Sequence, residues 1–258
     1  MVSINKQGTF KLLSYVTTKL AAAGFLLSVF FTFLLVASDF DMYEFVESIS
    51  EWFLWAVCFG YAIFCSVVID LVTYKFPRIS HKVKIALYLI AGFSLFLVIS
   101  LEVNIFTIIA GTVGAISALV YYFGTYLSDK IKPFRYIFAF ILPIVFLVFI
   151  PFDFTEKEQW HEVKKENSYE ATFEHFNGEH EVSIPLKAGQ QVILSHQFQN
   201  TNGGGHGFRI KNEENKLVGI TELGEYKWKF EVQETGVYRF VVTGDDVKGG
   251  FQLSWEIQ

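Results

Sequence analysis

The most prominent feature of the chain is a series of long apolar stretches in its first 150 residues, separated by short polar segments. A helix needs about 20 apolar residues to cross the hydrocarbon core of a bilayer. The stretches that reach or approach this length are 20–37, 52–72, 85–101, 105–127 and 134–150. This pattern predicts a polytopic membrane domain of about five transmembrane helices over residues 1–151.

Two of these stretches allow another interpretation. Only Glu102, Val103 and Asn104 separate the third stretch from the fourth, but a single helix would be nearly twice as long as the hydrocarbon core is thick. The first stretch ends near Ala37 and Ser38, which could form a signal-peptide cleavage site. Its apolar run of about 18 residues exceeds the usual 7–15 of a signal peptide, which favours an uncleaved span.

After residue 151 the pattern of apolar positions changes to a period of two. Residues 152–167 are highly charged and are interpreted as a connector that leads off the membrane, in a helical conformation as one option. From there to the end, short alternating runs are bounded by Gly and Asn/Asp turns, as in Tyr226, Trp228, Phe230 and Val232. Such runs predict an antiparallel β-sandwich of seven or eight strands over residues 168–258. The predicted fold class is therefore multi-domain α + β.

The charges at the span ends predict the orientation of the chain in the membrane. Basic residues precede the first stretch, and they recur after the second and after the fourth stretch. The segment 38–51 has five acidic residues and no base, and the turn at Glu102 also lacks a base. Because cytoplasmic loops carry an excess of Lys and Arg, the N-terminus is predicted to be cytoplasmic. An odd number of spans then places the sandwich outside the cell membrane.

Composition narrows the class of partner and the cellular context. Residues 152–258 contain 18 acidic residues and 11 Lys and Arg, a balance that argues against nucleic acid as a partner. The two cysteines, Cys58 and Cys65, both lie in the second apolar stretch, where small packing residues are the simpler interpretation than a redox or metal pair. A cysteine-free outer domain fits a bacterial surface protein.

The spans contain few ionisable residues, whereas transporters usually keep some at membrane depth. Asp70, Glu102 and Asp129 lie near span ends and are interpreted as interfacial residues rather than as parts of an ion path. Small residues favour close helix packing instead, either within the chain's own bundle or against a partner membrane protein. Pro143 is predicted to kink the fifth span. The candidate helix-packing residues are Gly111, Gly114, Ala115 and Ala118.

The sandwich offers one candidate ligand loop, which consists of Gly203, Gly204, Gly205 and His206. A phosphate-binding glycine loop should open a helix, whereas this one lies between strands, so a flexible hairpin loop is the alternative. Loops on a rigid scaffold often contact ligands.

No catalytic or metal pattern stands out in the sandwich. The histidine spacings match no zinc motif, and Glu213, Glu214, Asp245 and Asp246 are simpler to explain as solvated turn residues than as calcium ligands. A triad of Ser195, His196 and Asp245 lacks a nucleophile-elbow motif. Trp228 and Trp255 follow the strand alternation and are predicted core residues, while Trp160 is a candidate membrane-interface anchor. We therefore expect no catalytic residue, no cofactor and no metal.

The C-terminal part resembles the bacterial pre-peptidase C-terminal domain, a small jelly-roll-like sandwich. In this chain HGFRI replaces the middle segment with an Asp-x-x-Leu-like core that is usual in that family. The resemblance covers about 80 residues, none of them in the membrane part, and implies a non-catalytic accessory or binding module. The residues that carry it are Ala188, Gly189, Gln190, Thr235, Gly236, Tyr238, Gly250 and Phe251.

Together these features favour a non-enzymatic protein of the cell envelope. In this hypothesis the spans lie in the lipid bilayer, and the outer sandwich docks an envelope ligand or another membrane protein. A transporter or channel component with the sandwich as an extracellular cap is the alternative, and a cavity reaching Asp70 or Asn104 would favour it. A membrane-bound enzyme is a third option and would need polar residues clustered in one pocket of the sandwich.

Overall fold

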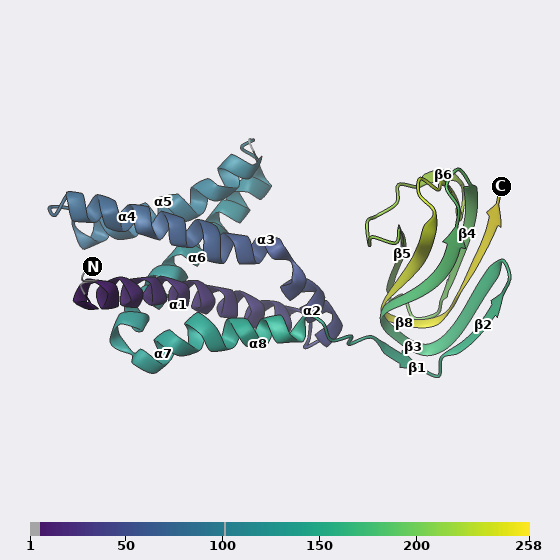
Figure 1. The fold of residues 1–258 in the computed structure, drawn as a ribbon, viewed down its shortest axis with the longest axis horizontal. Coiled ribbons are helices and arrows are strands. Elements are labelled where there is room, and N and C mark those ends of the chain that lie inside the picture. The colour runs from purple at the N-terminus through teal and green to yellow at the C-terminus, as the bar shows by residue number, and fades with distance from the viewer. Residues whose placement is uncertain (1–5, 101) are drawn as a thin grey trace, which may run out of the picture. The chain divides into compact units, whose positions relative to one another are not determined.

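The computed structural model describes residues 6–100 and 102–258 and divides the chain into two compact units (Figure 1). Met1–Phe152 is a helical unit and Asp153–Gln258 is a β unit. The helical unit contains five helices that are long and apolar enough to cross a membrane, and the β unit contains an eight-stranded antiparallel sheet. The predicted fold class is confirmed.

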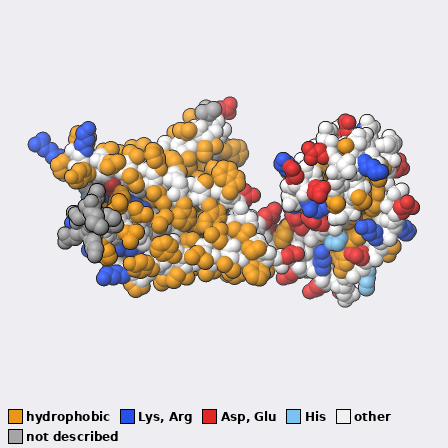
Figure 2. Space-filling view, in the orientation of Figure 1, with side chains coloured by type: hydrophobic (Ala, Val, Ile, Leu, Met, Phe, Trp, Pro, Cys, Tyr) orange, Lys and Arg blue, Asp and Glu red, His pale blue; other side chains and the backbone are white. Residues whose placement is uncertain are grey.

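The candidate spans begin and end at polar segments of the sequence. Leu101, which was predicted to end the third span, lies outside the described residues. Side chains on the surface of the helical unit are mainly hydrophobic, whereas charges of both signs cover the β unit (Figure 2). The five spans are Phe10–Ala37, Trp52–Lys75, His81–Ser100, Ile105–Lys130 and Lys132–Phe149.

The helix α1 (Lys6–Ala37) organises the helical unit. It contacts α2 (Met42–Ser50), the second span, α6 (Ile105–Lys130) and the fifth span. Its buried face includes three consecutive alanines, and small side chains allow neighbouring helices to approach closely. The buried apolar residues of α1 are Ala21, Ala22, Ala23, Leu26, Leu27 and Phe31.

The second and fifth spans each contain a π-helical turn. In the second span, η1 (Ala56–Tyr61) lies between α3 (Trp52–Trp55) and α4 (Ala62–Lys75). In the fifth span, η2 (Ile137–Ile141) lies between α7 (Lys132–Tyr136) and α8 (Leu142–Phe149). Pro143 follows η2 directly, in the first turn of α8. Proline has no backbone N–H to donate to the preceding turn. The change from π-helical to α-helical hydrogen bonding therefore lies next to Pro143, where the sequence predicts a kink.

The turn between the third and fourth spans separates two helices. The third span is α5 (His81–Ser100), and α6 starts after Asn104. The Asn104 side chain caps α6 by accepting a hydrogen bond of 2.9 Å from the Thr107 backbone N–H. A capped helix start is incompatible with one continuous helix across the turn.

The acidic segment after the first span contains a helix that the sequence analysis treated only as a loop. Asp41 caps this helix, α2, by accepting a hydrogen bond of 2.9 Å from the Glu44 backbone N–H. Phe45, Val46 and Ile49 are buried on one face of it. Their spacing of three and four residues is that of an amphipathic helix, and that spacing is the signal that the loop interpretation missed.

The β unit is built around two long strands, β3 (Ser168–Leu186) and β8 (Gly236–Ile257). They pair antiparallel, with register shifts between Phe173 and Gly178. One half of β8 also pairs with β5 (Gly205–Lys211), and the other half pairs with β4 (Gln191–Asn200). The two long strands therefore take part in both layers of the sandwich.

Two glycines lie where the long strands change layer. Gly178 and Gly249 have φ angles of 124° and 129°, which L side chains rarely adopt. At Gly249 a Cβ atom would also overlap the backbone carbonyl oxygen of Gln199 on β4. Glycine is therefore required at this bend for both its conformation and its close approach.

The remaining strands extend the sheet on either side of the long pair. The strand order is β1-β3-β8-β4-β7-β6, with β2 also pairing with β3 and β5 also pairing with β8. Their bounds are Glu156–Glu158 for β1, His161–Lys165 for β2, Thr221–Gly224 for β6 and Lys227–Glu231 for β7. Both β1 and β2 lie inside the segment 152–167. This segment, which was expected to be a connector, therefore contributes strands to the sheet.

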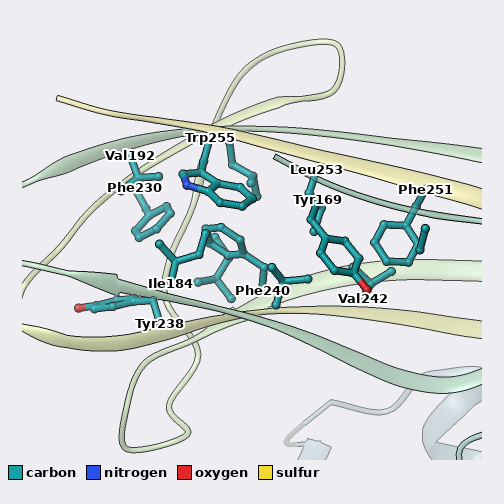
Figure 3. Close-up of a cluster of buried hydrophobic side chains, with 14 of the residues drawn as sticks. Tyr169, Ile184, Val192, Phe230, Tyr238, Phe240, Val242, Phe251, Leu253 and Trp255 are labelled. Carbon is teal, nitrogen blue, oxygen red and sulfur yellow. The ribbon is translucent and has the colours of Figure 1, made fainter. Parts of the chain in front are cut away.

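Apolar side chains from both layers fill the space between them (Figure 3). Val192, Phe230 and Trp255 face Ile184 and Phe240 across this core. Trp255 is buried, as the alternation of β8 predicted, whereas Trp228 is only half-buried. This core belongs to the β unit alone, so the unit has the hydrophobic interior that an independently folded domain needs.

Candidate binding groove in the β unit

The β unit contains a groove of about 720 Å³. It lies among the β5–β6 loop, the strands β6 and β7, and the start of β8. Its lining combines apolar side chains such as Leu217 and Leu223 with polar ones such as Lys229 and Glu231. Ligand sites typically have this size and this combination of apolar surface with a few polar groups.

The first wall of the groove is the β5–β6 loop, and Arg239 on β8 holds it. One guanidinium nitrogen of Arg239, Nη2, donates to the Asn212 carbonyl oxygen at 2.8 Å and to Asn215 Oδ1 at 2.7 Å. The loop is closed by the Lys216 backbone N–H, which donates to Asn212 Oδ1 at 2.9 Å. Asn215 has a φ of 63°, a conformation that asparagine tolerates better than most residues. The wall is therefore formed before any ligand binds.

The second wall is β6, which ends the strand order and pairs with β7. All four of its residues are exposed. Leu223 on β6 is 52% exposed and Leu217 on the opposite loop is 71% exposed. These two exposed leucines give the groove an apolar surface that a ligand can remove from water.

The floor of the groove is the end of the sandwich core. Phe230 and Tyr238 are buried there, with ring centroids 5.9 Å apart. The Tyr238 hydroxyl donates to the backbone oxygen of Glu234 at 3.1 Å. Gln191 and Gln233 also line the groove and provide amide donors and acceptors. The floor is thus rigid and apolar, with hydrogen-bonding groups at its margin.

The glycine loop named by the sequence analysis lies elsewhere in the β unit. Gly205 and His206 belong to β5 and pair with Asp245 and Gly244 of β8. Asn200 Nδ2 donates to the Gly204 carbonyl oxygen at 2.6 Å, and a Cβ at Gly204 would lie 2.6 Å from the Asp245 backbone oxygen. These glycines therefore allow a close approach of backbone to backbone. None of the residues 203–206 lines the groove.

Among the described residues, we find no site that brings together a catalytic triad or a set of metal ligands. Ser195 pairs with Ser254 and Lys227, while the His196 ring is buried 4.7 Å from Phe208 and 5.4 Å from Phe198. Within 6–100 and 102–258, no three His, Cys, Asp or Glu side chains are grouped to hold a metal ion. Asp246 lies 3.1 Å from His175 of β3, and Glu214 lies 2.6 Å from Lys216 in its own turn.

The sequence analysis missed a polar network on the first three strands of the β unit. The Tyr169 hydroxyl lies 2.5 Å from Glu162 Oε2 and 2.6 Å from His180 Nε2, and Lys157 Nζ lies 3.0 Å from His180 Nδ1. A consistent arrangement has Lys157 donating to Nδ1, Nε2–H donating to Tyr169, and Tyr169 donating to Glu162. Burial, with the nearby Lys157 charge, lowers the pKa of His180 to about 4.

Trp160, the candidate membrane anchor, takes part in this network. Its indole N–H donates to Glu162 Oε2 at 2.8 Å, and its ring stacks on Phe173 with centroids 5.2 Å apart. These contacts tie the segment between β1 and β2 to the core of the β unit. They give Trp160 a structural role within the sandwich.

The helical unit contains an ion cluster that the sequence analysis also missed. Lys19 is buried within α1, and its ammonium nitrogen lies 2.5 Å from Asp70 Oδ2 and 2.7 Å from Ser66 Oγ. The other Asp70 oxygen lies 2.8 Å from Lys84 of α5. Each pair is far apart in sequence, so only the packing of α1, α4 and α5 brings the three charges together.

The cluster lies near one end of the spans. Lys19 precedes the end of α1 at Ala37 by 18 residues, and Asp70 follows Trp52 by the same number, which corresponds to about 27 Å of helix in each case. The hydrocarbon core is about 30 Å thick. Lys19, Asp70 and Lys84 therefore lie near one end of the candidate spans, where their contacts join three helices.

The candidate helix-packing residues lie mainly between α5 and α6. Gly111 and Gly114 are buried, whereas Ala115 and Ala118 are half-buried. A Cβ at Gly114 would overlap the Gly92 carbonyl oxygen of α5, and a Cβ at Gly111 would lie 2.7 Å from the Phe93 ring. Gly92 was not named from the sequence, because its role depends on its register with α6.

A small cavity of about 50 Å³ lies in the same region of the helical unit. Tyr61, Cys65, Tyr88 and Tyr121 line it together with mainly apolar side chains, and its lining includes neither Asp70 nor Asn104. The feature that would favour a transporter is therefore not found at this cavity.

Comparison with known proteins gives little further information. No protein-family model matches the sequence, and no curated protein matches it either. The resemblance to the pre-peptidase C-terminal domain therefore stays a prediction. Among solved structures, PliG from Aeromonas hydrophila, a periplasmic inhibitor of g-type lysozyme, matches over 38% of this chain and 89% of its own. The identity is 14% and the TM-score is 0.27, so this likeness carries no functional argument.

Proposed function

We propose that this chain is a multi-pass protein of a bacterial cell membrane whose β unit, on the outer side, binds a partner without catalysing a reaction. The groove between the β5–β6 loop and β6 is the observation that carries the proposal. It combines a formed wall, an apolar floor and two exposed leucines. These are the properties of a binding surface, and no catalytic constellation accompanies them among the described residues of the β unit.

The distribution of charge in the helical unit supports the orientation. Lys and Arg side chains gather at the end where α1 begins, as Figure 2 shows. Lys75 at the end of α4, Arg78 in the loop and Lys82 in the first turn of α5 lie at this end, whereas the acidic α2 lies after the opposite end of α1. The basic end is cytoplasmic in this proposal. With five spans, the β unit then follows on the outer side.

The helical unit serves as an anchor in this account. The Lys19–Asp70–Lys84 cluster lies near a span end, and its charges satisfy one another. Gly92 and Gly114 hold α5 and α6 together within the chain, so these glycines are not free for a partner helix. The candidate spans provide lipid-facing apolar surface, while partner binding is assigned to the β unit.

Photocrosslinking in native membranes tests this function. We would place the photoreactive amino acid p-benzoylphenylalanine at Leu217, on the exposed wall of the groove. A matched chain would carry it at Val163, which is 55% exposed on β2 and away from the groove lining. We expect a discrete adduct after irradiation of the Leu217 chain, identified by mass spectrometry.

The control decides what an adduct means. An adduct found with Leu217 and absent with Val163 supports a partner in the groove. Equal adducts from both positions, or none from Leu217 in membranes where the protein is folded, would contradict the proposal. Turnover of a substrate by the purified chain would contradict its non-enzymatic part.

A further inference from the structure

We infer that the occupant of the groove is an extended, basic segment of a partner protein, which adds as a strand beside β6. This inference rests on the proposed function and names the kind of partner. Three independent features of the groove support it: the available strand edge, the exposed apolar side chains and the surrounding charge.

The strand edge provides the backbone interactions. β6 pairs with β7 on one side and ends the strand order of the sheet. An edge strand presents backbone N–H and C=O groups that another chain can pair with. Recognition by strand addition uses such an edge for affinity and neighbouring pockets for side-chain specificity. A compact small molecule would leave this edge unused.

The apolar side chains provide pockets for alternate residues of an extended segment. Leu223 on β6 and Leu217 on the loop are exposed and line the groove together with the buried Phe230. Successive side chains of a bound strand point in opposite directions. Every second side chain could therefore enter the groove, while the others remain in solvent.

The charge around the groove selects a basic segment. Residues 212–234, which form the loop, β6, β7 and the following turn, contain six glutamates and three lysines. One of the lysines, Lys216, is already paired with Glu214 at 2.6 Å. Glu231 and Lys229 both line the groove, so the negative balance comes from the surrounding glutamates. A cationic segment would meet a favourable potential here, and an acidic one would be repelled.

Direct binding with two designed peptides tests the inference. The probes are fluorescein-labelled heptapeptides, one alternating lysine with leucine and the other alternating glutamate with leucine. Binding to the full chain in detergent is followed by fluorescence polarisation. We expect saturable binding of the basic peptide at least tenfold tighter than of the acidic one. Added salt should weaken this binding, since it screens exposed charges.

Two substitutions locate the binding. Leu223→Lys should weaken binding of the basic peptide at least tenfold, because it removes an apolar contact and places a like charge in the groove. Val163→Lys introduces the same charge on β2, another strand at an outer edge of the sheet, and should leave binding within twofold. Hydrogen exchange should show new protection of the β6 amides when the basic peptide is bound.

The outcomes separate this inference from the function on which it rests. Equal affinity for both peptides, equal loss with both substitutions, or no β6 protection would overturn the basic strand as occupant. A groove-specific photoadduct from Leu217 would still support the proposed function in that case. Absence of the photoadduct together with absence of peptide binding would overturn both.

Discussion

At the scale of single residues, Gly114 shows how a small side chain determines the packing of two helices. Its position in a small-xxx-small pair predicts helix contact. The structure identifies the contact as Gly92 on α5. The backbone of Gly92 lies so close to Gly114 that a side chain at position 114 would not fit. The sequence alone cannot decide between packing within the chain and packing against another protein, since both require the same residues.

Replacing Gly114 with leucine should destabilise the helical unit. A Cβ at this position would overlap the Gly92 carbonyl oxygen, so α5 and α6 must separate. Overpacking of this kind costs about 1–3 kcal/mol. Gly60→Leu is the matched control, because nothing lies within 4 Å of a Cβ at Gly60. Thermal unfolding in detergent should show a lower midpoint for Gly114→Leu only, and equal midpoints would contradict the assigned contact.

Because His196 is buried, we expect the stability of the β unit to depend on pH. Burial lowers the pKa of His196 to about 4, with a smaller effect of nearby His206. The unfolded chain takes up this proton near pH 6.5, so it binds more protons than the folded chain between pH 6.5 and 4. Stability therefore falls as the pH drops through this window, and His180 acts in the same direction. Between pH 6.5 and 5, His196 should contribute a loss of about 1–2 kcal/mol.

Denaturant unfolding of the full chain, followed by tryptophan fluorescence, measures this loss. His196→Phe should give a shallower dependence on pH, because the buried titrating group is gone. His161→Phe is the matched control, since His161 is exposed on β2. The same slope for the His196 variant and the unchanged protein would show that burial of His196 does not control the effect.

At the scale of elements, regular patterns were predictable and pairings were not. The apolar stretches predicted the candidate spans, and the alternation in Tyr226–Val232 predicted the apolar face of β7. The segment 152–167 was harder, because β1 and β2 are entirely exposed and lack an apolar face. Their pairing with β3 makes them strands, and this long-range pairing leaves no local signal. The groove escaped prediction for the same reason, because the β5–β6 loop and β6 line it together with Gln191 of β4 and Tyr238 of β8.

The contact among α1, α4 and α5 predicts a strong effect of removing Asp70. Asp70→Asn would leave the buried Lys19 ammonium without its counter-charge. Breaking a buried ion pair costs about 3–5 kcal/mol, and the partial exposure of Asp70 reduces this to about 2–3 kcal/mol. Glu102→Gln, in the exposed turn before α6, should have little effect.

Unfolding of both variants in detergent tests the role of this cluster. The double variant Lys19→Met with Asp70→Leu should recover much of the stability, since it removes both charges. Failure of Asp70→Asn to destabilise the protein would contradict a locking role for the cluster.

The β5–β6 loop should lose its order when Arg239 is replaced. Arg239→Met removes the hydrogen bonds to Asn212 and Asn215 and keeps an apolar stem of similar length. We expect faster hydrogen exchange in 212–218 and a weaker photoadduct from Leu217. Arg209→Met on β5 provides a control at another arginine of the β unit. Unchanged exchange in the loop would show that Arg239 does not hold this wall.

At the scale of the whole molecule, the two units differ in how far the sequence reveals their roles. The length and hydropathy of the apolar stretches suffice to predict the candidate spans. A helix can cross a bilayer only if it is long enough and apolar enough. The binding proposed for the β unit depends on surface details at the groove, where Leu217 and Leu223 look like ordinary strand or loop leucines in the sequence. Their exposure in one groove is visible only in three dimensions.

The measurement that tests the central claim most directly is the sidedness of the two units in intact cells. With Cys58 and Cys65 replaced by alanine, single cysteines would be placed at Lys82, exposed in the first turn of α5, and at Thr201, on an exposed loop of the β unit. A membrane-impermeant maleimide is then applied before and after permeabilisation. The account predicts labelling of position 201 in intact cells and of position 82 only after permeabilisation. Labelling of position 82 in intact cells, or protection of position 201, would contradict it.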